Sequence, residues 1–237
     1  MVQTAPDSGM RVVKKEPNLR ELTTQTLRNA ILNMHFKPNE RLVERRLCEQ
    51  TGVSRTCVRE ALQHLESEGL VQRVPNRGLF VTTVSRDEAR QIYEVRAALE
   101  AMAGRRFAER ADDDAIRDLK AAFERITRTA GRTPVLDYVR ALDEFYDVLL
   151  QGAGNEVARR VLRTLRARMS YLRALTAQAA DKGRHAGTLA QMRHIVEAAS
   201  RRDAAATEAS CREFVLRSEE FAVEVLTEQE AADDPAG

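Results

Sequence analysis

The residues best suited to chemistry are two arginines that directly follow a serine. Arg55 and Arg59 stand four residues apart after Ser54, so on a helix their side chains leave from adjacent turns of one face. A guanidinium group is a planar fork of N–H donors that fits a phosphate or the edge of a guanine. The free amide groups at a helix start add further donors for an anion. This arrangement predicts a surface that binds nucleic acid.

The segment that carries these arginines has the pattern of an amphipathic helix. Ser54 is suited to cap its start and Gly69 to end it. With the apolar stripe turned inward, Thr56 and Arg59 fall on the opposite arc, while Cys57 belongs to the crowded first turn. The stripe follows the spacing i, i+3, i+4 and i+7 and consists of Val58, Ala61, Leu62 and Leu65. An isolated arginine-bearing helix could equally be an ordinary surface helix whose arginines are solvated. The elements before and after it must therefore show whether it binds nucleic acid.

Two more helices are expected just before this one. The first has its apolar stripe at Leu27, Ala30, Ile31 and Met34. It should end before Pro38, because proline cannot continue a helix interior. A shorter helix with Val43 and Leu47 follows and stops at Gly52. The turn that separates it from the arginine-bearing helix has about three residues, which is typical of a helix-turn-helix.

A β-hairpin is predicted directly after the third helix. Leu70–Val74 and Leu79–Thr83 are rich in β-forming residues and flank a break at Pro75–Gly78. The tip of the hairpin is formed by Asn76, Arg77 and Gly78. These residues could form only a turn, but an arginine at such a tip is well placed to enter a minor groove. Three helices and a hairpin predict a winged helix-turn-helix over residues 18–83.

The rest of the chain is predicted to be helical. The pattern from residue 84 to 230 is broken five times, which implies an all-α bundle of about six helices. One of these breaks is expected at Asp181–Gly187, which would place His185 in a loop. Residues 1–17 are expected to form a flexible basic arm and residues 231–237 a disordered tail. The fold class is therefore mostly α.

Composition narrows the class of protein further. The 38 basic residues nearly cancel 36 acidic ones, so the net charge of +2 does not itself indicate a nucleic-acid partner. No segment approaches the roughly 18 apolar residues of a membrane span and the first residues do not resemble a signal peptide, so we expect a cytoplasmic protein with no membrane partner. The three cysteines are too scattered for a disulfide framework or a Cys-rich zinc site. Motifs of phosphate-loop enzymes, serine hydrolases and zinc proteases are absent, so no catalytic activity is predicted.

Residues 18–83 resemble the GntR family of bacterial transcription factors. The resemblance rests on the motifs at residues 41–47, 52–62, 68–71 and 77–78. It implies that side chains of the second helix, the third helix and the wing contact an operator in double-stranded DNA. Together with the serine that starts the third helix, the predicted DNA-binding set is Arg45, Ser54, Arg55, Thr56, Cys57, Arg59, Asn76, Arg77 and Gly78.

The second region resembles the FadR-type C-terminal effector domain, known as FCD. The similar segments are Gln91–Glu100 and Phe145–Asn155. Many such domains hold a metal between an Asp, a His four residues later and two further histidines, but the corresponding places here are Leu142, Tyr146, Met192 and Phe214. Asp143 and His194 lie one and two residues away, and they would supply two ligands where a tight site needs three or four. We therefore expect no metal and no other cofactor.

Replacement of these ligands predicts an apolar cavity, either filled by its own side chains or lined for a ligand with a hydrophobic body. Arg96 could anchor a carboxylate in it, or could form an ion pair with Glu100 one turn later. The candidate effector-binding residues are Arg96, Tyr93, Leu142, Tyr146, Arg168, Met192 and Phe214.

These patterns predict a homodimeric, ligand-responsive repressor. Two recognition helices about one DNA turn apart would read a pseudo-palindromic operator, and a small organic acid or other metabolite would control binding. One alternative is a metal-responsive regulator of the same superfamily. Another is a DNA-bound interaction dimer whose bundle serves only to join two copies.

Overall fold

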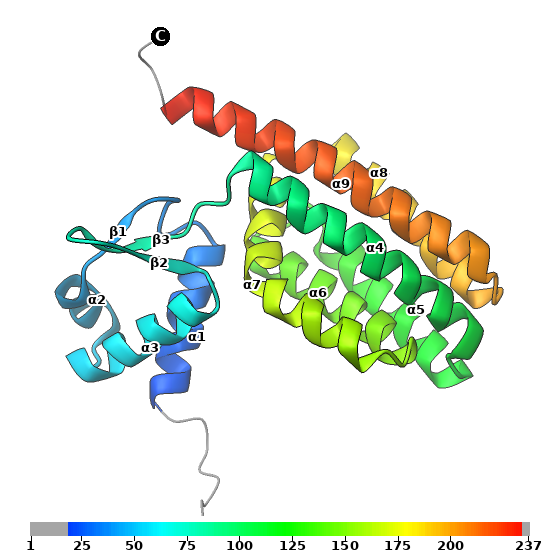
Figure 1. The fold of residues 1–237 in the computed structure, drawn as a ribbon, viewed down its shortest axis with the longest axis horizontal. Helices are drawn as coiled ribbons and strands as arrows, with labels where there is room; N and C mark the ends of the chain where they lie inside the picture. Colours follow the sequence, from blue (N-terminus) through cyan, green and yellow to red (C-terminus); the bar gives the residue numbers. More distant parts are fainter. Residues whose placement is uncertain (1–18, 234–237) are drawn as a thin grey trace, which may run out of the picture.

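The computed structural model describes residues 19–233. The N-terminal arm expected at residues 1–17 lies outside this range, as do residues 234–237 of the expected tail. The described chain forms a small N-terminal unit, Leu19–Val81, and a larger helical bundle, Arg86–Asp233, which lie beside each other (Figure 1). This mostly helical architecture with a small sheet confirms the predicted fold class.

Three helices make up most of the N-terminal unit: α1 (Leu19–Leu32), α2 (Glu44–Thr51) and α3 (Arg55–Ser67). Gly52 ends α2 in the left-handed conformation with φ of 69°, where a side chain would be strained. The predicted apolar stripe of α3 is buried against α1, which contributes Leu27 and Ile31 to the shared core.

The wing is a three-stranded antiparallel sheet. Its strands β1 (Arg41–Leu42), β2 (Val71–Val74) and β3 (Gly78–Val81) are arranged in the order β1-β3-β2. The predicted hairpin is β2 and β3, with Gln72 opposite Phe80, whereas the two-residue β1 was not foreseen. The turn places Asn76 at φ of 61°, a conformation that asparagine tolerates better than most residues.

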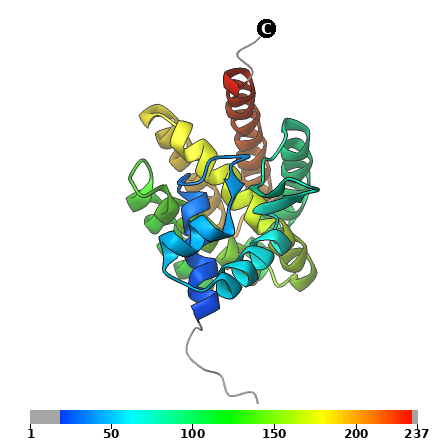
Figure 2. The ribbon, with the colours of Figure 1, turned by 90° about the vertical axis from the view of Figure 1, so that its left-hand side faces the viewer.

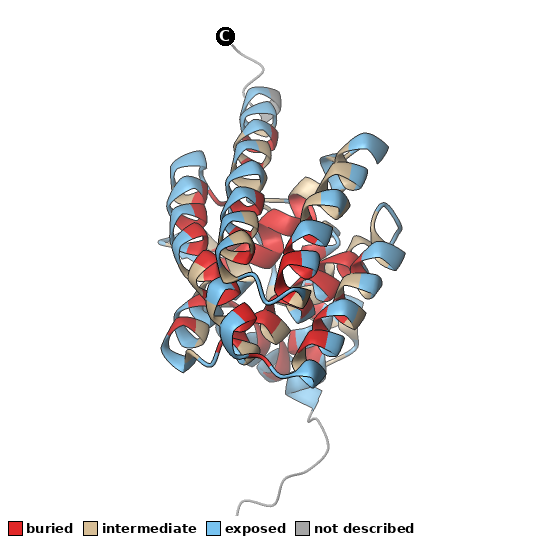
Figure 3. Ribbon diagram, turned by 90° about the vertical axis from the view of Figure 1, so that its right-hand side faces the viewer, coloured by how far each residue is buried: buried red, intermediate tan, exposed pale blue. Residues whose placement is uncertain are grey.

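Six helices build the bundle, in agreement with the prediction. They are α4 (Arg86–Arg110), α5 (Asp113–Thr129), α6 (Val135–Gly152), α7 (Glu156–Ala179), α8 (Lys182–Ser200) and α9 (Ala204–Asp233). The long helices α4 and α9 run side by side (Figure 1), and a Cβ at Gly104 would lie 2.6 Å from the sulfur of Cys211. Seen from the bundle end, buried positions line the inner helix faces and exposed ones the outside (Figure 3). In residues 19–233, no helix is long and apolar enough to cross a membrane.

Two helix boundaries differ from those expected. Asp181 caps α8 by accepting a hydrogen bond of 2.7 Å from the amide of Arg184, so α8 starts at Lys182 and contains His185. The prediction of a loop at His185 is therefore wrong. At the other end, α9 continues to Asp233, past the start of the tail expected at residue 231.

The N-terminal unit faces the bundle through α1 and the end of α3, and Figure 2 views the molecule from the side of this unit. Arg140 of α6 donates a hydrogen bond of 3.2 Å to Asn29 of α1. Arg168 of α7 lies over the backbone of Gly69 and pairs with Glu88 of α4 at 2.8 Å. The contact between the two units is thus narrow and includes polar pairs.

Candidate nucleic-acid interface and effector cavity

Helix α3 presents the predicted arginines at an exposed start. The Ser54 side chain accepts a hydrogen bond of 3.3 Å from the amide of Cys57, which caps the helix as expected. Arg55, Thr56 and Arg59 are exposed, while the apolar stripe faces the core. The amides of the first turn and two guanidinium groups therefore share one accessible surface.

Cys57 does not belong to this surface. Its side chain is buried, and its sulfur lies 3.3 Å from the hydroxyl oxygen of Thr23 in α1. The thiol thus packs between α1 and α3, because residue 57 lies on the side of the first turn of α3 that faces the core. We remove its side chain from the proposed DNA-contacting set.

Carboxylates hold two of the exposed arginines of this surface. Arg59 donates two hydrogen bonds to Glu44 of α2, at 3.2 and 3.1 Å, and Arg45 pairs with Glu49 at 3.0 Å. The hydrogen bond from Arg59 lowers the pKa of Glu44 despite a small opposing effect of burial. Such exposed pairs are weak because water screens them, so a phosphate can replace the carboxylate.

The wing tip adds a second basic element. Asn76 and Arg77 are exposed, and the guanidinium of Arg77 lies 5.4 Å from the ring centre of Phe80. Arg41 of β1 contacts the same tip, since a Cβ at Gly78 would lie 3.5 Å from its side chain. Sequence analysis missed Arg41 as a candidate because its position beside the tip depends on the pairing of β1 with β3.

A small cavity lies inside the bundle, between α4, α6, α7, α8 and α9. Its volume is about 60 Å³, far below the roughly 300–1,000 Å³ of a typical small-molecule site. Its lining includes Tyr93, Arg96, Leu142, Arg173 and Phe214. Of the two expected outcomes, the structure therefore favours a cavity that its own side chains largely fill.

Two buried arginines at this cavity each pair with a carboxylate, of which Glu100 is buried and Asp143 is only partly buried. Arg96 pairs with Glu100 at 2.8 Å, as one of the two expected arrangements requires. Burial is the largest single influence and disfavours the Arg96 cation, but the charge and hydrogen bond of Glu100, together with Tyr93 and Tyr146, outweigh it and raise the pKa of Arg96. Arg173 of α7 pairs with Asp143 of α6, which also accepts a hydrogen bond of 3.0 Å from Ser170.

Some buried polar atoms in this cluster have no partner. Among the described residues, Arg173 Nη2 and Tyr146 Oη make no hydrogen bond, although both are buried. The Arg173 guanidinium stacks 4.9 Å from the centre of the Tyr146 ring. An unpaired buried donor is costly, so a ligand oxygen that reached Arg173 Nη2 would be bound favourably. Sequence analysis missed Arg173 because nothing near it in the chain sets it apart from other arginines of α7.

The predicted effector residues are only partly brought together. Tyr93, Arg96, Leu142 and Phe214 line the cavity. Tyr146 lies just behind it, in a smaller space shared with Glu100 and Arg173. Met192 is fully buried and Arg168 pairs with Glu88 at the boundary with the N-terminal unit, so neither belongs to the cavity lining.

The metal site implied by the FCD resemblance does not fit these residues. Leu142 and Phe214 have no ligating atom, and the nearby Asp143 is engaged by Arg173 and Ser170. His194 is exposed on α8. Within the described part of the chain, no group of three His, Cys, Asp or Glu side chains could hold a metal ion.

Fold and surface together are those of a class of DNA-binding regulators, in which a winged helix-turn-helix is joined to a helical bundle. Residues 19–81 match the bacterial regulatory proteins of the gntR family, and residues 91–217 match the FCD domain. The chain therefore belongs to the GntR family of transcriptional regulators, with an FCD effector-binding domain.

Individual relatives agree with this assignment. The chain is 32% identical over 142 residues to the Nta operon transcriptional regulator of Aminobacter aminovorans, covering 60% of this chain and 67% of that protein. It is 28% identical over 137 residues to the uncharacterized HTH-type regulator YdhC of Bacillus subtilis, covering 57% of this chain and 61% of YdhC. The solved structure of E. coli McbR/YncC has the same fold, with a TM-score of 0.70, 20% identity, and coverage of 90% of this chain and 99% of that one.

Proposed function

We propose that this protein is a cytoplasmic, ligand-responsive repressor that binds a pseudo-palindromic operator as a homodimer. The observation that carries the proposal is the accessible start of α3, where Arg55 and Arg59 flank free helix amides next to the basic wing tip. A helix of this kind enters the major groove while the wing reaches the flanking minor groove. Two such units one DNA turn apart would block access to a promoter.

The proposed DNA-contacting set is Arg45, Ser54, Arg55, Thr56, Arg59, Asn76, Arg77 and Gly78, with Arg41 added from the structure. The arginines supply most of the affinity, because each neutralised phosphate releases counterions and makes binding salt-dependent. Arg55 and Arg59 supply base discrimination, since they leave the turn of α3 that enters the groove.

The effector is proposed to be a small organic acid that binds in the bundle cavity. Support comes from the cationic side chains that line it: Arg96, Arg173 and Arg184 do so, whereas none of the lining residues is a carboxylate. A ligand larger than a few atoms would have to displace side chains such as Phe214, which would move α9 against α4. Such movement is the route by which ligand would change the spacing of the two DNA-binding units.

Selection of bound fragments from random DNA tests the DNA-binding part. We expect a pseudo-palindrome with half-sites one helical turn apart, and a dimer in size-exclusion chromatography. Arg55→Ala should lower operator affinity roughly 5- to 150-fold, because a good base contact is worth about 1–3 kcal/mol. Arg117→Ala, which removes an equally exposed arginine of α5, is the matched control and should leave affinity unchanged. Unchanged binding by Arg55→Ala in a folded dimer would contradict the proposal.

The alternatives differ in ligand chemistry. A metal-responsive regulator would retain metal after purification and lose operator binding with a chelator, whereas we expect neither. An interaction dimer without a ligand would show no thermal stabilisation by any carboxylic acid, while a true effector stabilises the fold and shifts operator affinity together.

A further inference from the structure

A second and much larger hollow lies between the N-terminal unit and the bundle. It has a volume of about 550 Å³, within the range of small-molecule sites, and its walls come from α1, the end of α3, α6 and α7. We call it the inter-unit cleft. It is about nine times as large as the bundle cavity of about 60 Å³.

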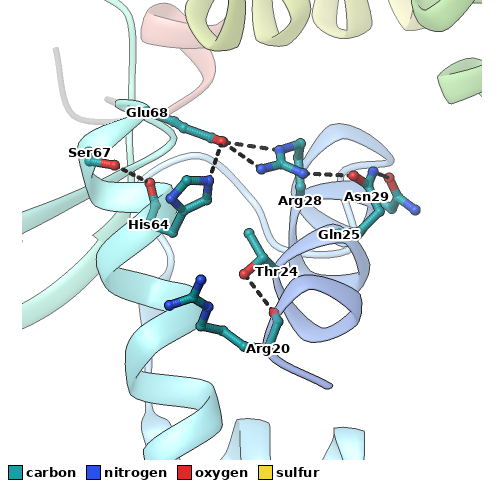
Figure 4. A network of polar contacts seen from close by, with 8 residues as sticks. All are labelled: Arg20, Thr24, Gln25, Arg28, Asn29, His64, Ser67 and Glu68. Carbon is teal, nitrogen blue, oxygen red and sulfur yellow. Dashed lines mark hydrogen bonds and ion pairs between the residues drawn. The ribbon is translucent and has the colours of Figure 1, made fainter. Parts of the chain in front are cut away.

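The wall from the N-terminal unit is a fixed polar network (Figure 4). Arg28 of α1 donates to both carboxylate oxygens of Glu68, at 2.6 and 3.0 Å, and to Gln25 at 2.7 Å. His64 approaches the same Glu68 carboxylate at 3.1 Å. The charges of Arg28 and Glu68 cancel, so this wall offers oriented hydrogen-bonding groups without net charge.

The wall from the bundle carries a positive excess. Arg140 and Arg163 are more than half exposed, and their nearest carboxylates lie at 4.0 and 3.6 Å, beyond ordinary hydrogen-bond length. Arg166 also lines this wall and pairs with Asp147. The one acid of the wall, Asp143, is already neutralised by Arg173 on its other side.

Between these walls the floor is apolar. Leu32 and Leu70 come from the N-terminal unit and Leu136 and Val139 from α6, and all but Val139, which is fully buried, keep a few per cent of their surface exposed. Apolar floor, cationic wall and hydrogen-bonding wall are the parts that an amphipathic anion requires. We infer that the inter-unit cleft binds a small organic anion with an apolar body, whose acid group is held by Arg140 and Arg163.

This site would act differently from the bundle cavity. A ligand in the cleft would touch both units at once, whereas the direct contact between them is narrow and includes the hydrogen bond from Arg140 to Asn29 at 3.2 Å. Binding would therefore favour the arrangement of the N-terminal unit seen here over others. By linkage, operator and cleft ligand must then affect each other's affinity by the same factor.

Fluorescence titration of the full-length protein with 1-anilinonaphthalene-8-sulfonate, an apolar anion of suitable size, tests the inference. We expect saturable binding of one probe per chain that weakens at high salt. The double variant Arg140→Ala with Arg163→Ala should bind at least about tenfold more weakly, because two charge-assisted contacts are lost. Arg117→Ala with Arg125→Ala, two arginines of α5 that do not line the cleft, is the matched control and should bind like the unchanged protein.

A second variant tests the location of the binding site without removing a charge. Ala167 lines the cleft on α7 and is half-buried, so Ala167→Trp should fill the space and abolish probe binding while circular dichroism and thermal unfolding remain normal. Probe affinity equal to that of the unchanged protein, in either the Arg140/Arg163 variant or Ala167→Trp, would overturn the inference. So would a lack of saturable probe binding to the unchanged protein. Operator binding by these variants without probe is expected to persist, which separates a failure of the cleft site from a failure of the proposed DNA-binding function.

Discussion

The N-terminal unit and the bundle each contain an arginine–glutamate ion pair, exposed in the first and buried in the second. Arg59 and Glu44 lie 3.1 Å apart with the arginine side chain 57% exposed, while Arg96 and Glu100 lie 2.8 Å apart with side chains only 3% and 1% exposed. The distances are nearly the same, but water screens the first pair and not the second. Burial therefore decides which arginine can leave its partner for a phosphate and which must keep it.

The same contrast explains where each unit can bind ligand. In the N-terminal unit, carboxylates of α2 hold Arg45 and Arg59 only weakly, so DNA phosphates can replace these carboxylates at small cost. In the bundle, Glu100 and Asp143 are needed to neutralise Arg96 and Arg173, and a ligand can use only what they leave free, such as Arg173 Nη2.

The largest effect is expected for a broken buried pair. Glu100→Gln leaves the Arg96 charge buried without compensation and should lower the free energy of unfolding by about 3–5 kcal/mol in urea titrations. Glu49→Gln, which removes the exposed partner of Arg45, should change it by less than about 1 kcal/mol. Replacing the whole buried pair, with Arg96→Met and Glu100→Leu, should recover most of the loss. Equal losses in Glu100→Gln and Glu49→Gln would refute the role given to burial.

A smaller effect, and one with opposite signs, is expected at the exposed pair. Arg59→Ala should weaken operator binding roughly 5- to 150-fold with little change in stability. Glu44→Gln should instead strengthen binding to non-specific DNA, by about two- to fivefold, because it frees Arg59 and removes a negative charge that faces phosphate. Fluorescence anisotropy at two salt concentrations measures both. If both variants weakened binding alike, Glu44 would be a base contact rather than a holder of Arg59.

Sequence alone identified the parts of this molecule that depend on local pattern. The apolar spacing of α3, its Ser54 cap and the wing tip at Asn76 are all set by neighbouring residues, and the structure contains each of them. The six bundle helices were foreseen for the same reason. The loop expected at Asp181–Gly187 was wrong because the Asp181 side chain caps a helix that starts there.

What could not be foreseen depends on contacts between distant segments. The β1 strand has two residues and exists only because Arg41 pairs with Phe80, 39 positions along the sequence. Arg173 lies next to Arg96 only through the packing of α7 against α4. The inter-unit cleft needs the placement of two units relative to each other, on which periodicity within one segment carries no information.

The smallest expected effect is on the pH dependence of stability, because the titrating groups of the two units act in different pH ranges. Burial lowers the pKa of His185 in the bundle from its ordinary value near 6.5, although Asp181 partly opposes this. The unfolded chain then binds more protons at His185 than the folded one, so stability should begin to fall as pH drops below about 6.5. The pKa of Glu44 is lowered by the hydrogen bond from Arg59, so the contribution of Glu44 to stability is intact above pH 4.5 and is lost only as pH falls below that value.

Urea unfolding measured between pH 4.5 and pH 6.5 should therefore depend on pH in the unchanged protein and less so in His185→Gln. Glu44→Gln should reduce the pH dependence of the free energy of unfolding only below pH 4.5. Both groups are partly exposed, so the free energy of unfolding should change only gradually with pH. If His185→Gln altered the pH dependence below pH 4.5 instead, the assignment of the two pH ranges to His185 and Glu44 would be wrong.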